Sequence, residues 1–156
     1  MFRGITQLNL DAKGRIAIPA KYRDRLLSGC EGNMVVTIDP TNSSNEPCLL
    51  LYPLPEWDVI QAKIDALSSF NPASRKVQRL LVGHADDVVM DGNGRLLLSG
   101  ALREFARMEK KVVLIGQGKK FELWNEDTWN ACRQGWLEEA VNDSDTVPAE
   151  LDSLSL

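Results

Sequence analysis

The sequence predicts an α+β fold: a pseudo-twofold β-barrel built from two tandem β-β-α-β-β copies that are joined by a helical connector. The first observation is an internal duplication, because residues 11–23 and 91–103 share their Asp, Gly, Arg and apolar positions at an offset of 80. The second is the order within each copy, in which a glycine turn, an Arg, a short apolar strand and a helix start follow one another. The third is physical: an isolated hairpin is marginal in water, so the two copies must bury their apolar faces against each other.

The composition is that of a globular protein. A chain of 156 residues can hold one domain, or two small ones that share a core. Its 44% hydrophobic and 26% charged residues argue against intrinsic disorder. Apolar runs such as 49–52 are too short to cross a bilayer, and the N-terminus has no signal-peptide pattern. We therefore expect a cytoplasmic protein without a membrane partner.

The first copy is assigned to residues 1–54. Its turn depends on Gly14, because glycine readily takes the positive φ that a tight hairpin requires, and Gly94 has the same place in the second copy. Arg15 follows the turn directly, and Pro19 stands where a helix would begin. The pattern predicts a strand at 5–10 paired with a strand at 15–18, a helix at 20–27, strands at 34–38 and 48–52, and a polar loop at 39–47.

A helical connector is predicted at residues 55–82. A first helix to about residue 69 places Trp57 and Ile64 on one side. Asn71 and Pro72 then supply a cap and a first-turn proline for a second helix that runs to residue 81. The segment is too regularly patterned to be a loose linker. Its basic residues are interpreted as a solvated or subunit-bridging face, with phosphate contact as the alternative; they are Arg75, Lys76 and Arg79.

The second copy is assigned to residues 83–141 and repeats this order without the long loop. It is predicted to contain strands at 86–90, 95–98, 111–115 and 120–124, a helix at 99–107, a hairpin turn at 116–118 and a helix that begins after Asp127. Residues 142–156 are rich in Asp, Ser, Pro and Glu, so we expect an acidic, weakly ordered tail. The tryptophans are interpreted as core or interface anchors; they are Trp57, Trp124, Trp129 and Trp136.

Catalytic and metal-binding patterns are not found in the sequence. Cys30, Cys48 and Cys132 are odd in number and widely spaced, which argues against a disulfide framework and against a zinc site. His84 is the only histidine, and no Ser/His/Asp or Cys/His arrangement for nucleophilic catalysis is visible. We predict neither an enzyme nor a cofactor, metal or small-molecule substrate.

The charge is distributed unevenly along the chain. The net charge is −4, but residues 1–30 carry six basic and two acidic side chains, a net of +4. Residues 121–156 carry one basic and nine acidic side chains, a net of −8. The asymmetry allows a basic face for phosphate on a protein whose other end is acidic.

The repeated phrase resembles a known family. The pattern Asp-x-Lys-Gly-Arg-apolar-x-Ile-Pro of residues 11–19 is similar to the swapped-hairpin DNA-binding domain of the AbrB type, and its duplication in one short chain resembles the MraZ family of transcriptional regulators. Further matches are residues 2–4, residues 50–57, Asn71-Pro72 leading to Arg75 and Arg79, and residues 121–124. The resemblance covers nearly the whole chain and thins in the loop at 40–47 and after about residue 137.

This resemblance implies a swapped-hairpin fold and ring-shaped homo-oligomers. It also implies a nucleoid-associated transcriptional repressor of the division and cell-wall gene cluster. Such a regulator would bind direct repeats in double-stranded promoter DNA upstream of its own operon. The alternative from a different class is an oligomeric scaffold, whose acidic tail or exposed tryptophans recruit a protein partner.

The residues of the two turns also favour DNA binding, independently of the resemblance. An Arg on a rigid turn can bind guanine bidentately or grip a phosphate, and the alternative for Arg15 and Arg95 is an ion pair with Asp11 or Asp91. We favour DNA for Arg15 because four basic residues surround it: Lys13, Lys21, Arg23 and Arg25. The second copy has Asn93 in place of Lys13 and carries the acidic residues Asp86, Asp87 and Glu104. The predicted DNA-binding residues are Arg3, Lys13, Arg15, Lys21, Arg23 and Arg25, with Arg95 and Arg103 as secondary candidates.

Overall fold

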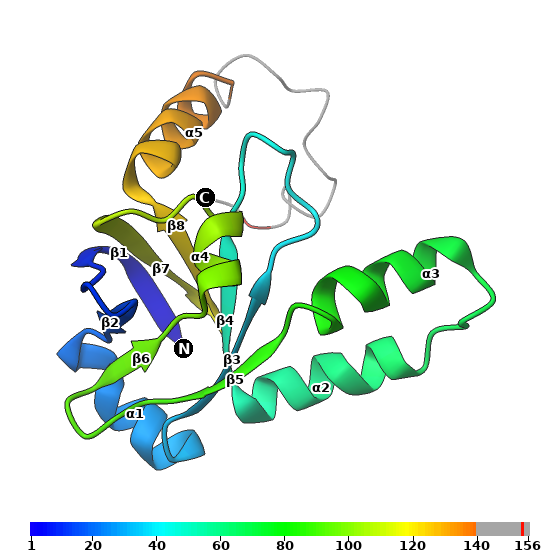
Figure 1. Cartoon of the computed structure of the whole chain (residues 1–156), viewed down its shortest axis with the longest axis horizontal. Helices are drawn as coiled ribbons and strands as arrows, with labels where there is room; N and C mark the ends of the chain where they lie inside the picture. Colours follow the sequence, from blue (N-terminus) through cyan, green and yellow to red (C-terminus); the bar gives the residue numbers. More distant parts are fainter. Residues whose placement is uncertain (140–153, 155–156) are drawn as a thin grey trace.

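A computed structural model describes residues 1–139 and residue 154. The first copy and the connector contain β1 (Phe2–Asn9), β2 (Arg15–Ala17), α1 (Ala20–Cys30), β3 (Asn33–Ile38), β4 (Leu49–Pro53), α2 (Leu54–Asp65), α3 (Pro72–Val77) and the π-helical turn η1 (Gln78–Val82). The second copy contains β5 (Asp86–Val89), β6 (Arg95–Leu97), α4 (Gly100–Phe105), β7 (Lys111–Gly118), β8 (Phe121–Asn125) and α5 (Glu126–Glu139). The predicted α+β class is therefore confirmed (Figure 1). Apart from residue 154, the predicted acidic tail lies outside the described residues.

The sheet order shows the pseudo-twofold symmetry of the two copies. Six strands pair in the order β1-β7-β8-β4-β3-β5, and β2 pairs with β6 in a separate two-stranded ribbon. Exchanging each strand with its counterpart in the other copy reproduces the six-strand order read backwards. The pseudo-twofold axis therefore passes between β8 and β4, which pair antiparallel, and through the β2–β6 ribbon.

The predicted pairing of residues 5–10 with residues 15–18 is wrong. β1 instead pairs with β7 of the second copy, from Phe2 opposite Gly118 to Asn9 opposite Lys111. β2 pairs with β6, so that Ile16 lies opposite Leu96, and both side chains are fully buried. The turn between β1 and β2 is present as predicted, but the strands that it joins bury their apolar side chains against the other copy rather than against each other.

The strands do not close into the predicted barrel through a continuous ladder of hydrogen bonds. β1 and β5 are the two edges of the six-stranded sheet, and the β2–β6 ribbon contacts both of them without joining the sheet ladder. The ribbon therefore covers one face of the sheet, which we call the inner face, and each copy contributes one strand to it.

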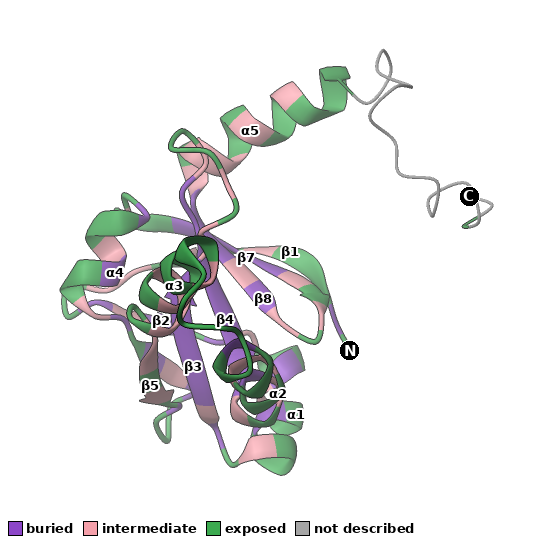
Figure 2. Ribbon diagram, turned by 90° about the vertical axis from the view of Figure 1, so that its right-hand side faces the viewer, coloured by how far each residue is buried: buried purple, intermediate pink, exposed green. Residues whose placement is uncertain are grey.

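Both faces of the central strands are buried (Figure 2). The inner face packs on the ribbon and on α1 and α4, with the rings of Phe2, Tyr22 and Phe121 in mutual contact. The outer face has two clusters: Trp57 of α2 packs on the β3–β4 side, and Trp129 of α5 packs on Trp124 on the β7–β8 side. The helices that cover the two outer clusters, α2 and α5, follow β4 and β8 respectively, so this arrangement also obeys the pseudo-twofold symmetry.

The connector is helical, as predicted, with shifted boundaries. α2 ends at Asp65, and the Asn71 side chain caps α3 by accepting hydrogen bonds from the backbone N–H groups of Ala73 at 2.9 Å and Ser74 at 3.4 Å. Figure 1 shows α2 and α3 projecting away from the sheet as an arm. η1 returns the chain to the body, where Thr37 of β3 donates a hydrogen bond to the Leu81 carbonyl at 2.6 Å.

The second hairpin turn lies slightly later than predicted. β7 continues through residues 116–118, and Gln117 N–H donates to the Lys120 carbonyl at 2.9 Å across a turn in which Gly118 has a φ of 82°. The shift arises because Gly116 and Gly118 still pair with β1. None of the described helices is long and apolar enough to cross a membrane.

Candidate nucleic-acid interface

Each copy presents a tight turn whose Asp side chain organises the backbone. One carboxylate oxygen of Asp11 accepts hydrogen bonds from the N–H groups of Lys13 and Arg15, both at 2.9 Å. Asp91 does the same for Asn93 and Arg95, again at 2.9 Å. Gly14 and Gly94 close the turns with φ values of 85° and 75°, which a side chain would strain.

The arginine after each turn pairs with the Asp of its own turn. Nε of Arg15 donates to Asp11 at 2.8 Å, and Nε of Arg95 donates to Asp91 at 3.1 Å. These are the ion pairs that the sequence analysis gives as the alternative to DNA binding by Arg15 and Arg95. Both carboxylates have lowered pKa values, first because of the hydrogen bonds from the backbone N–H groups of Arg15 and Arg95, so both remain ionised at neutral pH.

The ion pairs hold the arginines without using up their donors. Only Nε of each guanidinium is engaged within the described part of the chain, which leaves the terminal nitrogens of Arg15 and Arg95 for a ligand. The side chains are 26% and 31% exposed. Ion pairing and ligand binding are therefore compatible here, and the pair fixes the direction of each arginine.

The β2–β6 ribbon brings the two arginines onto one surface. Arg15 lies opposite Leu97 and Ala17 lies opposite Arg95, so these four side chains share the outer face of the ribbon. We call these four residues the ribbon face. Ile16 and Leu96, between them, point inward and are fully buried. The arginines thus occupy one diagonal of a rigid two-stranded platform.

A second pair of arginines locks each turn against the other copy. Ile18 N–H donates to the Gly94 carbonyl at 2.8 Å, and Leu98 N–H donates to the Gly14 carbonyl at 2.9 Å. Nε of Arg23 donates to the Ile18 carbonyl at 2.7 Å, and its guanidinium lies over Gly94, where an added Cβ would come within 2.5 Å of Nε.

Arg103 of the second copy makes the equivalent contacts with the turn of the first copy. Its Nε donates to the Leu98 carbonyl at 3.2 Å, and its guanidinium lies 2.9 Å from an ideal Cβ at Gly14. Arg23 and Arg103 were both predicted to bind DNA, and the structure shows that each supports the turn of the opposite copy. Arg23 and Arg103 have the same spacing from the turn glycine in the two copies of the duplicated phrase. This shared spacing is the sequence pattern that could have indicated their common role in supporting the turns.

The remaining predicted basic residues form a separate group at the start of β1. Nζ of Lys21 lies 4.8 Å from the Tyr22 ring centroid, and the Tyr22 hydroxyl donates to the Arg3 carbonyl. A terminal nitrogen of Arg25 donates to the Met1 carbonyl at 2.6 Å. The expectation that the basic residues of α1 surround Arg15 is therefore wrong, because the hairpin swap places the start of α1 beside the turn of the second copy.

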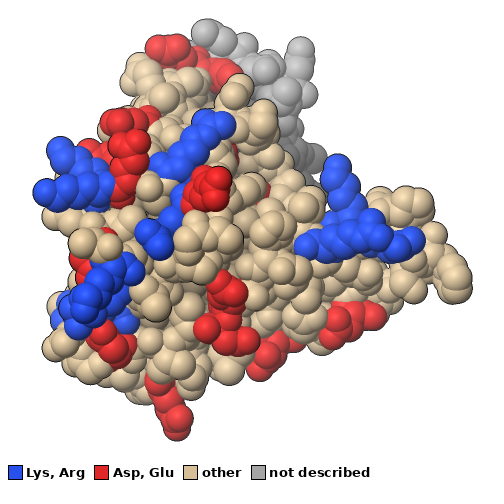
Figure 3. Space-filling view, in the orientation of Figure 1, with Lys and Arg blue, Asp and Glu red and all other residues tan. Residues whose placement is uncertain are grey.

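The swap also redistributes the acidic residues. Lys13, at the exposed tip of the first turn, lines a surface hollow together with Asp86, Asp87 and Arg103. Asp86 and Asp87, which precede Arg95 in the sequence, therefore lie beside Lys13 of the first turn. Figure 3 shows Lys and Arg side chains, mixed with acidic ones, on the side of the molecule that carries β2, β6 and α4, and a separate basic group over α3.

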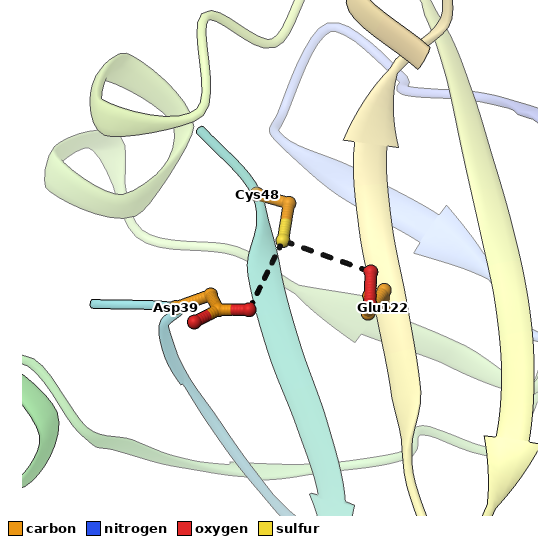
Figure 4. A group of neighbouring side chains, drawn as sticks. All are labelled: Asp39, Cys48 and Glu122. Atoms are coloured by element: carbon orange, nitrogen blue, oxygen red, sulfur yellow. Dashed lines mark hydrogen bonds between the residues drawn. The ribbon is translucent and has the colours of Figure 1, made fainter. Parts of the chain in front are cut away.

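One group of potential metal ligands occurs in the described part of the chain (Figure 4). The Cys48 sulfur lies 3.9 Å from a carboxylate oxygen of Asp39 and 3.9 Å from one of Glu122. Burial, reinforced by the two carboxylates, raises the pKa of this thiol far above its ordinary value of 9.0, so it is protonated at neutral pH. Glu122 also accepts from Trp124 at 3.0 Å and from Gln117 at 2.6 Å. The group therefore acts as a hydrogen-bonded tie between β3, β4 and β8.

Comparison with known proteins assigns the fold and the duplicated turns to a family. The family model described as "MraZ protein, putative antitoxin-like" matches residues 1–80 and again residues 81–147. The chain belongs to the MraZ family. The first match covers the first copy and most of the connector, the second covers the second copy, and together they span nearly the whole chain.

Relatives that carry the name "Transcriptional regulator MraZ" are similar over most or all of the chain. The protein of Halorhodospira halophila is 53% identical over 156 residues, which is 100% of both chains. That of Idiomarina loihiensis is 63% identical over 130 residues, or 83% of each chain, and that of Coxiella burnetii is 50% identical over 156 residues, 100% of both. As a member of the MraZ family, the chain is a transcriptional regulator and not an enzyme.

Proposed function

We propose that this MraZ-family regulator binds double-stranded promoter DNA through the ribbon face. The observation that carries the proposal is the pair of arginines, Arg15 and Arg95, held by ion pairs on the outer face of a rigid two-stranded ribbon. A two-stranded ribbon fits the major groove, where an arginine can bind O6 and N7 of guanine bidentately. The terminal nitrogens that the ion pairs leave available are the donors such a contact requires.

The other basic residues supply phosphate contacts. Lys13, at the tip of the first turn, is exposed beside the ribbon, and Arg3, Lys21 and Arg25 form a separate basic group at the start of β1. Contacts of this kind position a protein on the duplex and dominate its salt dependence. Arg23 and Arg103 act mainly by fixing the turns that precede Arg95 and Arg15.

The finer parts of the proposal concern assembly and target. One three-residue ribbon offers few contacts, so several subunits in a ring-shaped homo-oligomer would supply affinity through avidity, and head-to-tail subunits match direct repeats. We propose that the sheet and ribbon act as one pseudo-twofold swapped-hairpin barrel in each subunit. The target would be the promoter of the chain's own operon in the division and cell-wall gene cluster, with repression as the outcome. Such a regulator works in the cytoplasm, at the nucleoid.

A gel shift with the promoter upstream of the chain's own gene tests this proposal. We expect a shift that unrelated competitor DNA does not remove. If two subunits together neutralise about six phosphates, the affinity should fall by about 10³-fold from about 50 to about 200 mM salt. Absence of any sequence-specific shift at moderate salt would contradict DNA regulation by this face and would favour the scaffold alternative.

The connector is the proposed contact between subunits. Phe70 is 95% exposed, and Leu67 and Val77 nearby in the sequence are 41% and 37% exposed. Such a concentration of exposed apolar side chains at the tip of a projecting arm is typical of an interaction site.

Replacing Phe70 with Asp is therefore expected to lower the oligomeric mass, because a buried carboxylate would oppose the contact. Mass is measured by size-exclusion chromatography with light scattering. Leu137→Asp on α5 is the matched control, since Leu137 is 51% exposed but lies away from the arm, and it should leave the mass unchanged. A Phe70→Asp protein of unchanged mass would place the subunit contact elsewhere.

A further inference from the structure

The pseudo-twofold symmetry is broken at one position of the ribbon face. The arginines are equivalent, since Arg15 and Arg95 follow matching turns and pair with matching aspartates. The other diagonal holds Ala17 from the first copy and Leu97 from the second. The two copies thus present the same charge and different apolar volumes to whatever covers this face.

Leu97 is a large apolar side chain on the outer, exposed face of the ribbon. It is 56% exposed, while Leu96 and Leu98 on either side are 0% and 1% exposed. The leucine stands directly across the ribbon from Arg15, so a base pair bound by that arginine would lie within reach of the Leu97 methyl groups. A ligand that covers Arg15 must therefore also cover Leu97.

The apolar group that the major groove offers is the 5-methyl of thymine, which apolar side chains contact in direct readout. Arginine reads guanine through hydrogen bonds, but it cannot distinguish thymine from a base that lacks the methyl group. Leucine can make this distinction by burying the methyl, whereas Ala17 on the opposite strand is too short to reach as far.

We infer that Leu97 is a specificity-determining residue that reads a thymine methyl group beside the base bound by Arg15. The inference rests on the proposed function. It also gives the ribbon face a direction, because a pseudo-symmetric ribbon with Leu on one diagonal end and Ala on the other prefers one orientation on the duplex. A preferred orientation is what a direct repeat requires and a palindrome does not.

The test uses promoter duplexes in which deoxyuridine replaces thymine, a change that removes the 5-methyl group and keeps the hydrogen-bonding edge. Wild-type protein should bind the substituted duplex more weakly, by about fourfold for each methyl group that Leu97 buries. Leu97→Ala protein should bind thymine DNA more weakly than wild type and should no longer distinguish the two duplexes. Val59→Ala is the matched control, because Val59 is 53% exposed on α2 and is not part of the ribbon face.

The outcomes separate this inference from the proposed function. Loss of thymine discrimination in Leu97→Ala, with discrimination kept in Val59→Ala, supports the inference. Specific binding by a Leu97→Ala protein that still discriminates thymine overturns it and leaves the DNA-binding proposal standing. A lowered oligomeric mass with discrimination kept also overturns it and makes Leu97 a subunit contact. Failure of wild-type protein to bind promoter DNA specifically overturns both.

Discussion

Replacing Arg15 with Ala is expected to abolish most of the specific affinity for promoter DNA. A bidentate contact between arginine and guanine contributes about 1–3 kcal/mol of discrimination, so an oligomer that engages two ribbons loses about 2–6 kcal/mol. The expected rise in the dissociation constant is about 25-fold to about 20,000-fold, since each 1.4 kcal/mol is about tenfold. Fluorescence anisotropy with the promoter duplex and with an unrelated duplex measures both the affinity and the specificity.

The turn should survive this substitution. Asp11 keeps its hydrogen bonds from the backbone N–H groups of residue 13 and residue 15, so the variant should remain folded and oligomeric by circular dichroism and chromatography. Arg95→Ala is the companion variant in the second copy, because Arg95 has the same ion pair on the same face, and we expect a loss of the same order. Unchanged promoter binding by Arg15→Ala would remove this residue from the site. Unchanged binding by Arg95→Ala alone would show that only the first copy reads DNA.

Replacing Phe121 with Ala is expected to lower the free energy of unfolding by about 3–5 kcal/mol. Phe121 is fully buried, and its ring centroid lies 4.3 Å from that of Phe2 and 5.0 Å from that of Tyr22. The truncation leaves a cavity between β8, α1 and the edge strand β1, so both copies lose packing at once. Urea denaturation at a fixed protein concentration gives the change.

The matched control for this cavity is another phenylalanine of the second copy. Phe105 on α4 is 37% exposed, so Phe105→Ala should cost much less, within about 1 kcal/mol. Equal destabilisation by the two substitutions would mean that the aromatic cluster of Phe2, Tyr22 and Phe121 does not hold the copies together.

The elements of the fold could be predicted from local patterns. The turn at Gly14, the Asn71-Pro72 helix start and the helix at 20–27 are determined by neighbouring residues, and the structure confirms each of them. The partner of each strand could not be predicted in this way. β1 pairs with β7, and nothing within ten residues of either strand distinguishes this pairing from that of an ordinary hairpin.

The candidate site likewise contains residues that local sequence patterns could identify and residues that they could not. The sequence identified Arg15 and Arg95 because each follows its turn, and it offered the ion pairs as an alternative, which the structure shows. It misplaced Arg23 and its neighbours on α1, because proximity along the chain was taken for proximity in space. Leu97 was missed altogether, since a leucine inside an apolar run gives no sign that it faces outward.

The exchange of hairpins sets the order in which the newly made chain can fold. β1 finds its partner only after residue 118 has been synthesised, and the turn at Gly14 is secured only once Arg103 arrives. The first half therefore leaves the ribosome with β1 unpaired and Ile16 without its covering strand. The six-stranded sheet can be completed only after β7 and β8 have been synthesised, so a truncated product of the first copy alone leaves its unpaired strands exposed to proteolysis.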